Sequence, residues 1–94
     1  MTRKECITNL FLLGFKKSII NKDPIDRNYY REFTELKSPI QHIYTKGVIQ
    51  VNLLYSKDTF VNGHISKYIG NVGPYVQSFI TYNKLIDNVI ERLK

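Results

Sequence analysis

Two histidines and a single cysteine are the side chains in this sequence best suited to nucleophilic or acid–base chemistry. A thiol beside an imidazole can attack an acyl carbon, so Cys6 paired with His42 or His64 would make a small hydrolase. Their spacings match no cysteine-protease or redox motif. Cys6 and His42 fall on apolar faces of the elements predicted below, and His64 is expected to be exposed after a turn. A structural role is therefore favoured for Cys6 and His42, and a hydrolase using His42 or His64 is the least favoured function.

The sequence contains no recognisable motif for binding a metal ion or a phosphate group. No H-x-x-x-H or C-x-x-C pattern occurs. An acidic group between positions 23 and 35 is explained more simply by a solvated turn and strand face; its members are Asp23, Asp26, Glu32 and Glu35. Gly70-Asn71-Val72-Gly73 lacks the Gly-Lys-Ser/Thr ending of a P-loop, so we interpret it as a connecting loop. We expect no cofactor, no metal and no enzymatic activity.

Cationic side chains are in excess and unevenly distributed. The 94 residues carry 14 Lys and Arg against 8 Asp and Glu, which gives a net charge of +6. Residues 1–22 hold five cations and one acid, and residues 36–57 hold three lysines and no acid. Such an excess attracts nucleic acids, nucleotides or acidic protein surfaces, although solubility alone also accounts for it.

The segment from Arg27 to Phe33 combines the two kinds of side chain that bind single-stranded nucleic acids. Tyrosines stack on bases, while arginines and lysines neutralise phosphates. Tyrosine also has a high strand propensity, so half-buried packing is the slightly favoured alternative. The candidate binding residues are Lys16, Lys17, Arg27, Tyr29, Tyr30, Arg31, Lys37 and Lys46.

The elements that must position these residues begin and end with helices. Thr2 and Glu5 have the spacing of a capping box, and Gly14 suits a left-handed helix end, which predicts a helix over residues 3–13. Thr81 can cap a second helix over residues 82–93, which carries an apolar stripe. The β-branched residues before it favour a strand over residues 75–80, although one long helix from Pro74 also fits.

Between the helices the pattern predicts strands. A short edge strand is expected over residues 15–20, and further strands over 29–36, 40–45 and 48–55. The last two would form a hairpin around Lys46-Gly47 that pairs Tyr44 with Ile49 and separates an apolar face from a polar one. A three-residue loop with a glycine bulge is the alternative.

Asn62-Gly63 is the strongest local hairpin signal in the chain. It predicts a turn between residues 59–61 and 64–69, with Asp58 opposite Lys67 and Phe60 opposite Ile65. Residues 70–74 are expected to follow as a loop.

Together these elements predict a single α+β domain over residues 1–94. We expect a four- to five-stranded, mainly antiparallel sheet with the N- and C-terminal helices packed on one of its faces. The unpaired Cys6 suits a reducing compartment, and the longest apolar run, Leu10 to Leu13, is too short to span a membrane. No signal peptide is recognised, so the cytoplasm is the expected location.

The compact layout, the composition rich in Ile, Lys, Asn and Tyr, and the ending Phe79-Ile80-Thr81-Tyr82-Asn83-Lys84-Leu85-Ile86 resemble small accessory proteins of phages and mobile elements. That group includes anti-CRISPR and other anti-defence inhibitors. The resemblance implies a viral inhibitor that binds a host nucleoprotein or effector stoichiometrically in the host cytoplasm. Many such inhibitors of Cas9 are acidic DNA mimics, whereas this chain is basic. A direct single-stranded nucleic-acid or nucleotide-binding module is the alternative.

Overall fold

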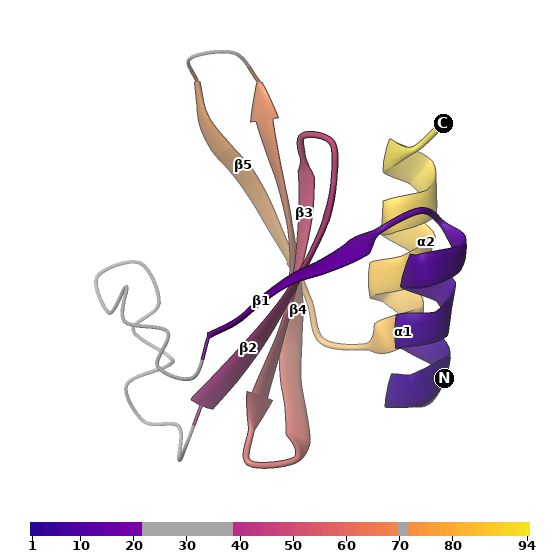
Figure 1. Ribbon diagram of the computed structural model, residues 1–94, viewed down its shortest axis with the longest axis vertical. Helices are drawn as coiled ribbons and strands as arrows, with labels where there is room; N and C mark the ends of the chain where they lie inside the picture. Colours follow the sequence, from indigo (N-terminus) through magenta and orange to yellow (C-terminus); the bar gives the residue numbers. More distant parts are fainter. Residues whose placement is uncertain (22–38, 70–71) are drawn as a thin grey trace.

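A computed structural model describes residues 1–21, 39–69 and 72–94 of the chain. This part forms a five-stranded antiparallel sheet in which every strand lies beside its neighbour in sequence, with one helix before the strands and one after them along the chain (Figure 1). The predicted α+β class, with both helices on one face of the sheet, is confirmed. The elements are α1 (Arg3–Leu12), β1 (Lys16–Asn21), β2 (Pro39–Lys46), β3 (Ile49–Ser56), β4 (Thr59–Ile69), β5 (Val72–Phe79) and α2 (Tyr82–Arg92).

Helix α1 begins and ends as its sequence predicts. The Thr2 hydroxyl accepts a hydrogen bond from the Glu5 backbone N–H at 3.2 Å, and the Glu5 carboxylate accepts one from the Thr2 backbone N–H at 3.0 Å. At the other end Gly14 has a φ of +94°, and the Phe15 N–H donates to the Leu10 carbonyl at 3.0 Å. This Schellman closure turns the chain so that Phe15 enters the core and β1 can start.

The β2–β3 hairpin keeps the predicted faces in a different register. Tyr44 pairs with Val51 instead of Ile49, and the turn consists of Gly47 and Val48. Gly47 takes a φ of +58°, which glycine adopts without steric cost. The predicted pairing is therefore wrong by two residues. Because side chains alternate with a period of two, this shift leaves the apolar and polar faces unchanged.

The predicted turn at Asn62-Gly63 is wrong, because β4 runs through both residues without a break. The chain reverses instead at Lys57-Asp58, where Lys57 has a φ of +55°. Tyr55 then pairs with Phe60, and the β3–β4 register shifts by one residue at a bulge before Leu54 pairs with Asn62. The pairs predicted for Asp58 with Lys67 and for Phe60 with Ile65 are consequently absent, since Ile49 faces Lys67 and Val51 faces Ile65.

Gly63 has a packing role in place of the predicted turn role. A Cβ atom at this position would lie 2.8 Å from Leu85 Cδ2, a separation that real Cβ atoms essentially never show. Leu85 is fully buried at the start of α2. Glycine at position 63 therefore allows α2 to lie close against β4.

The strand-then-helix prediction for the C-terminal stretch is confirmed. The Thr81 hydroxyl accepts from the Lys84 backbone N–H at 3.3 Å and begins α2. The loop predicted over residues 70–74 is wrong from Val72 onward, because β5 already begins there and pairs with Ile69. The predicted edge strand over residues 15–20 is confirmed as β1. The strand predicted over residues 29–36 lies outside the described residues.

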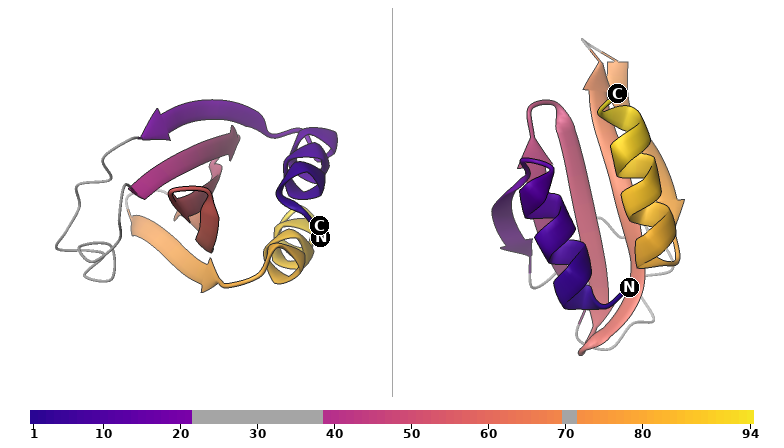
Figure 2. Two further views of the ribbon diagram at one scale, coloured as in Figure 1. Left: turned by 90° about the horizontal axis from the view of Figure 1, so that it is seen from below. Right: turned by 90° about the vertical axis from the view of Figure 1, so that its right-hand side faces the viewer.

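The two helices lie side by side and point in the same direction across one face of the sheet (Figure 2). Between them and the sheet lies a hydrophobic core with Cys6 and Leu10 from α1, Val51 and Leu53 from β3, and Val89 from α2, all fully buried. Neither described helix is of a length and apolarity that would let it cross a membrane.

Candidate cationic interface

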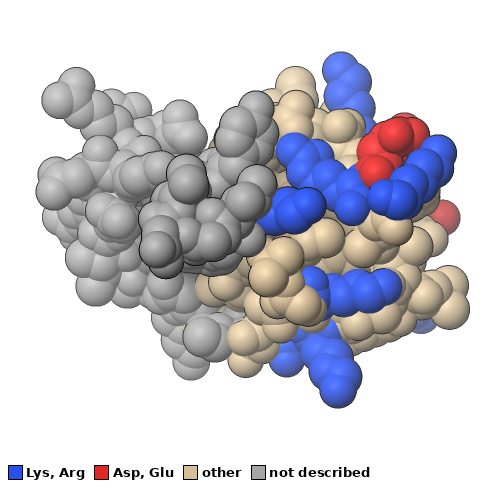
Figure 3. Space-filling view, turned by 90° about the horizontal axis from the view of Figure 1, so that it is seen from above, with Lys and Arg blue, Asp and Glu red and all other residues tan. Residues whose placement is uncertain are grey.

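Cationic side chains gather at one end of the described molecule (Figure 3). This end holds the β2–β3 turn, the start of β1 and the end of α2. The residues are Lys16, Lys17, Lys46, Lys67, Arg92 and Lys94. We call this surface the cationic end. The only acid among the described residues of this end is Glu91, which pairs with Lys94 at 3.2 Å.

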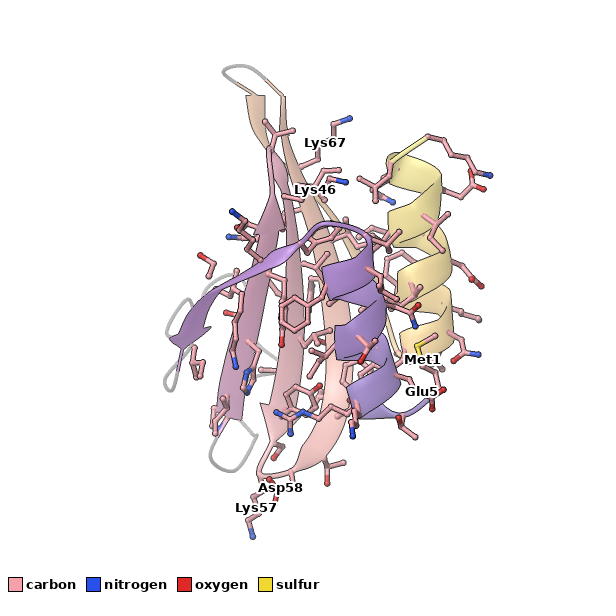
Figure 4. All side chains as sticks on the ribbon, turned by 45° about the vertical axis from the view of Figure 1, so that its right-hand side comes forward. Met1, Glu5, Lys46, Lys57, Asp58 and Lys67 are labelled. Carbon is pink, nitrogen blue, oxygen red and sulfur yellow. The ribbon has the colours of Figure 1, made fainter. Side chains whose placement is uncertain are left out.

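Sheet register brings these lysines together from distant parts of the chain. Lys46 and Lys67 both pair with Ile49, so they lie on the same face of the sheet on either side of β3. Figure 4 shows the two side chains beside each other near the end of α2. Lys16 lies opposite Thr45, next to the same turn. Antiparallel pairing thus places residues 16, 46 and 67 at one edge of the molecule.

Some of these cations already have structural partners. The Lys46 ammonium donates to the Leu13 carbonyl at 2.6 Å and satisfies a backbone acceptor at the end of α1. The Arg92 guanidinium donates to the Gln77 side-chain carbonyl. Lys16 and Lys67, in contrast, make no hydrogen bond or ion pair with another described residue. These two ammonium groups are available to a ligand.

The remainder of the described chain is almost balanced in charge. It carries four cations, Arg3, Lys4, Lys57 and Lys84, against three acids, Glu5, Asp58 and Asp87. The turn that holds Lys57 and Asp58 lies at the opposite end from Lys46 and Lys67 (Figure 4). The excess positive charge of the described part is therefore concentrated at the cationic end, which can attract a negatively charged partner over about one Debye length.

The structure places three of the predicted binding residues, and all three belong to the cationic end. Lys16, Lys17 and Lys46 are exposed. The other five predicted residues, Arg27, Tyr29, Tyr30, Arg31 and Lys37, lie outside the described residues. Lys67, Arg92 and Lys94 could not be assigned to this surface from the sequence, because only the antiparallel register and the direction of α2 bring them to the same end.

The tyrosine side chains that the structure describes face inward. Tyr44 and Tyr55 are each 1% exposed on the helix-facing side of the sheet. The Tyr55 and Tyr82 hydroxyls lie 2.9 Å apart, and the Tyr82 ring stacks on Phe60 with centroids 4.0 Å apart. Burial, followed by the hydrogen bond to Tyr82, raises the pKa of Tyr55. These rings support the core, and they are not placed to stack on nucleic-acid bases.

His42 is a partly buried histidine held by α1. The Arg3 guanidinium lies 3.3 Å from His42 Nε2 and also covers the Tyr55 ring, with its central carbon 4.1 Å from the ring centroid. A guanidinium can only donate, so Nε2 accepts and Nδ1 carries the hydrogen. Nδ1 is buried and has no hydrogen-bond partner. Burial, Lys17 and Arg3, in that order, lower the pKa of His42 and favour its neutral form.

The lowered pKa of His42 predicts a loss of stability in acid. The unfolded chain accepts the proton more readily than the folded one, so this contribution is complete above the ordinary pKa of about 6.5 and disappears as the pH falls through the folded value. Urea unfolding at a series of pH values between about 7.5 and 5 measures the effect. His42→Gln, which keeps an acceptor for Arg3, should show a flatter dependence. Equal pH dependences in the two proteins would contradict the assignment.

The structure overturns one expectation about nucleophilic chemistry, for His64, and agrees with another, the structural role of Cys6. His64 was predicted to be exposed after a turn, but it lies within β4 and is 1% exposed, so this prediction is wrong. Cys6 is fully buried, and burial raises the pKa of its thiol to about 12. Cys6 therefore stays protonated near neutral pH and is not an activated nucleophile.

Within residues 1–21, 39–69 and 72–94, no three His, Cys, Asp or Glu side chains gather closely enough to hold a metal ion. The described part of the chain therefore offers lysine and arginine side chains, not a metal centre, as its candidate contact surface. Comparison with known proteins found no match to this chain among protein-family models, curated proteins or solved structures.

Proposed function

We propose that this protein acts by stoichiometric binding, and that its cationic end docks on a host nucleoprotein. The observation that carries the proposal is the uneven charge of the described surface. Six cations and one acid meet at one end, while the rest of the described chain is nearly neutral. A surface of this kind is complementary to exposed phosphates or to an acidic protein face.

Lys16 and Lys67 are the side chains of the cationic end best placed to contact a ligand. Lys16 and Lys67 come from different strands, and neither has a partner among the described residues that a ligand would have to displace. Binding a polyanion there releases counterions and costs little rearrangement of the domain. The resemblance to small phage and mobile-element proteins adds the expectation that binding blocks the host complex, as an anti-CRISPR or other anti-defence inhibitor does.

Free single-stranded nucleic acid is the less favoured partner. Binding of single strands relies on exposed aromatic rings as well as on cations. Tyr44 and Tyr55 are buried, and Tyr82 is stacked against Phe60. The described tyrosines therefore add no stacking platform to the charge of this end, which suits phosphate backbones or acidic side chains displayed on an assembled partner.

Matched charge variants test this proposal. Lys16→Gln/Lys67→Gln/Lys94→Gln removes three charges from the cationic end, and Lys4→Gln/Lys57→Gln/Lys84→Gln removes three charges elsewhere. Each immobilised protein is incubated with extract from the cells that produce it, with and without nuclease. We expect the wild type and the second variant to retain one complex at a fixed ratio, and the first variant to lose it. Equal losses from the two variants, or none from either, would overturn the proposal.

Oligonucleotides distinguish direct nucleic-acid binding from docking on a nucleoprotein. Each contacted phosphate of a single strand changes the slope of log affinity against log salt by roughly −0.7. A direct binder should therefore lose about two units of slope in the Lys16/Lys67/Lys94 variant, measured by fluorescence anisotropy with a labelled single strand. Absence of oligonucleotide binding at low salt, together with retention of the complex after nuclease treatment, would favour a protein surface as the contact.

A further inference from the structure

Three polar side chains form a hydrogen-bonded chain on the sheet face opposite the helices. Ser78 Oγ lies 3.1 Å from His64 Nδ1, and His64 Nε2 lies 2.8 Å from Asn62 Oδ1. The β4–β5 register sets His64 directly opposite Ser78. Asn62 precedes His64 by two residues and therefore shares its face. Gly63, between them, faces Leu85 of α2, which confirms that this chain points away from the helices.

The hydrogen bond to Asn62 indicates which nitrogen of His64 is basic. An amide oxygen can only accept a hydrogen bond, so the Nε2 beside it must carry the hydrogen. In the neutral imidazole Nδ1 then presents a lone pair, and the Ser78 hydroxyl donates to it. This is the arrangement of nucleophile, general base and orienting group that acyl-transfer enzymes use.

The three residues differ in exposure in the way such a site requires. His64 is 1% exposed, so its orientation is held by the surrounding structure. Ser78 is exposed on β5, which has a sheet neighbour only on the β4 side among the described strands. Edge strands leave alternate backbone N–H groups unpaired, and such donors can stabilise an oxyanion.

A neighbouring residue adds an unused acceptor beside the base. Asn52 lies opposite His64 across the β3–β4 pair and is 5% exposed. Its Oδ1 atom is buried and has no hydrogen-bond partner. A buried polar atom without a partner is costly, so this acceptor is suited to an N–H or O–H group of a bound molecule.

We propose that Ser78 is a base-activated nucleophile that takes an acyl group from an ester, with His64 as general base and Asn62 as its positioning residue. The Ser78 oxygen forms a bond to the acyl carbon as its proton passes to His64 Nδ1. The ester C–O bond then breaks, and the alcohol leaves with that proton. Water, deprotonated by His64, releases the acyl group as a carboxylic acid and restores Ser78.

This activity is independent of the proposed docking function. The chain Asn62–His64–Ser78 lies across β4 and β5, and none of its members belongs to the cationic end. Ser78→Ala should therefore retain the complex captured through Lys16 and Lys67. The two proposals can fail separately.

p-Nitrophenyl acetate is the probe for this site. We expect the wild type to release p-nitrophenolate at least about a hundredfold faster than Ser78→Ala, the lower range for general-base assistance. Ser18→Ala, which removes an exposed serine from the other edge strand, should leave the rate unchanged. Mass spectrometry of the acetylated protein should locate the acetyl group on Ser78. Equal rates in wild type and Ser78→Ala, or acetylation confined to lysines and the N-terminal amine, would overturn the proposal.

Substitutions at position 62 test the positioning role. Asn62→Ala should slow acetyl transfer, because the imidazole loses the group that fixes its tautomer. Asn62→Asp keeps an acceptor and adds a negative charge that stabilises the imidazolium form. It should restore the rate and move the acidic limb of the pH–rate profile to higher pH. An unchanged profile in Asn62→Asp, in a protein with wild-type circular dichroism, would show that Asn62 does not act on His64 and would overturn its assignment.

Discussion

A methyl group added at Gly63 is expected to lower the free energy of unfolding by about 1–3 kcal/mol, the range for overpacking a well-filled core. The new Cβ atom would meet Leu85 Cδ2 at 2.8 Å and Cδ1 at 3.2 Å. Leu85 is fully buried, so its side chain has little room to withdraw. Urea or thermal unfolding of Gly63→Ala measures the loss.

A double-mutant cycle shows whether this loss comes from the Leu85 contact. Leu85→Ala alone should cost about 2–5 kcal/mol, because it empties a fully buried site. In the double variant the Cβ atom of residue 63 occupies the space that Leu85 vacates. The double variant should therefore lose clearly less free energy of unfolding than the sum of the losses in the two single variants. Additivity to within about 0.5 kcal/mol would mean that Gly63 serves another purpose.

Gly47→Ala provides the control cycle. Nothing lies within 4 Å of a Cβ atom at position 47, and the cost of alanine there comes only from the φ of +58°. That cost, roughly 1–2 kcal/mol, is local to the backbone. It should therefore add to the cost of Leu85→Ala without interaction.

Cys6 is expected to react with thiol reagents about a thousandfold more slowly in the folded protein than in the unfolded chain at about pH 8. Burial raises the pKa of the thiol from 9.0 to about 12, and each unit lowers the thiolate fraction tenfold. The side chain is also fully buried, so the reagent must wait for the structure to open.

The rate of colour release from Ellman's reagent measures this protection. Denaturation in concentrated guanidinium chloride should expose one reactive thiol per chain, and Cys6→Ser should show none in either state. Val89→Ala, which loosens the core around Cys6, should accelerate labelling in buffer. Immediate labelling of the wild type in buffer would contradict the burial of Cys6.

The sequence predicted the helices well because the residues that cap them lie within a few positions of the helix ends. The Thr2–Glu5 capping box and the Gly14 end of α1 are complete within the chain segment that forms them. The same holds for Thr81 at the start of α2. These helix ends therefore do not depend on contacts with distant parts of the chain.

Strand register was less predictable because it depends on contacts far away in the chain. Asn62-Gly63 has the composition of a tight turn, yet Gly63 is needed where α2 crosses β4, and its partner Leu85 lies 22 positions later. The β2–β3 turn lies one residue later than predicted. A turn at Gly47-Val48 keeps the same alternation of apolar and polar side chains as a turn at Lys46-Gly47. Alternation fixes which face a side chain takes, but several registers satisfy it equally.

The candidate sites show the same limit. Lys16 and Lys46 were identified from charge alone, whereas Lys67 joins them only through the shared partner Ile49. Ser78 carried no signal at all in the sequence, since it is one of several serines and lies 14 positions after His64. Only the β4–β5 register brings its hydroxyl to the imidazole.

The order of the strands has a consequence for how the domain folds. Since each strand pairs with its neighbour in sequence, the sheet can form one hairpin at a time, starting from the turns at Gly47-Val48 and Lys57-Asp58. The contact between α1 and α2, in contrast, closes nearly the entire chain and carries the largest entropic cost of loop closure. During synthesis the apolar face of the sheet therefore stays half uncovered until α2 has been made, and chaperones have their best opportunity to bind in that interval.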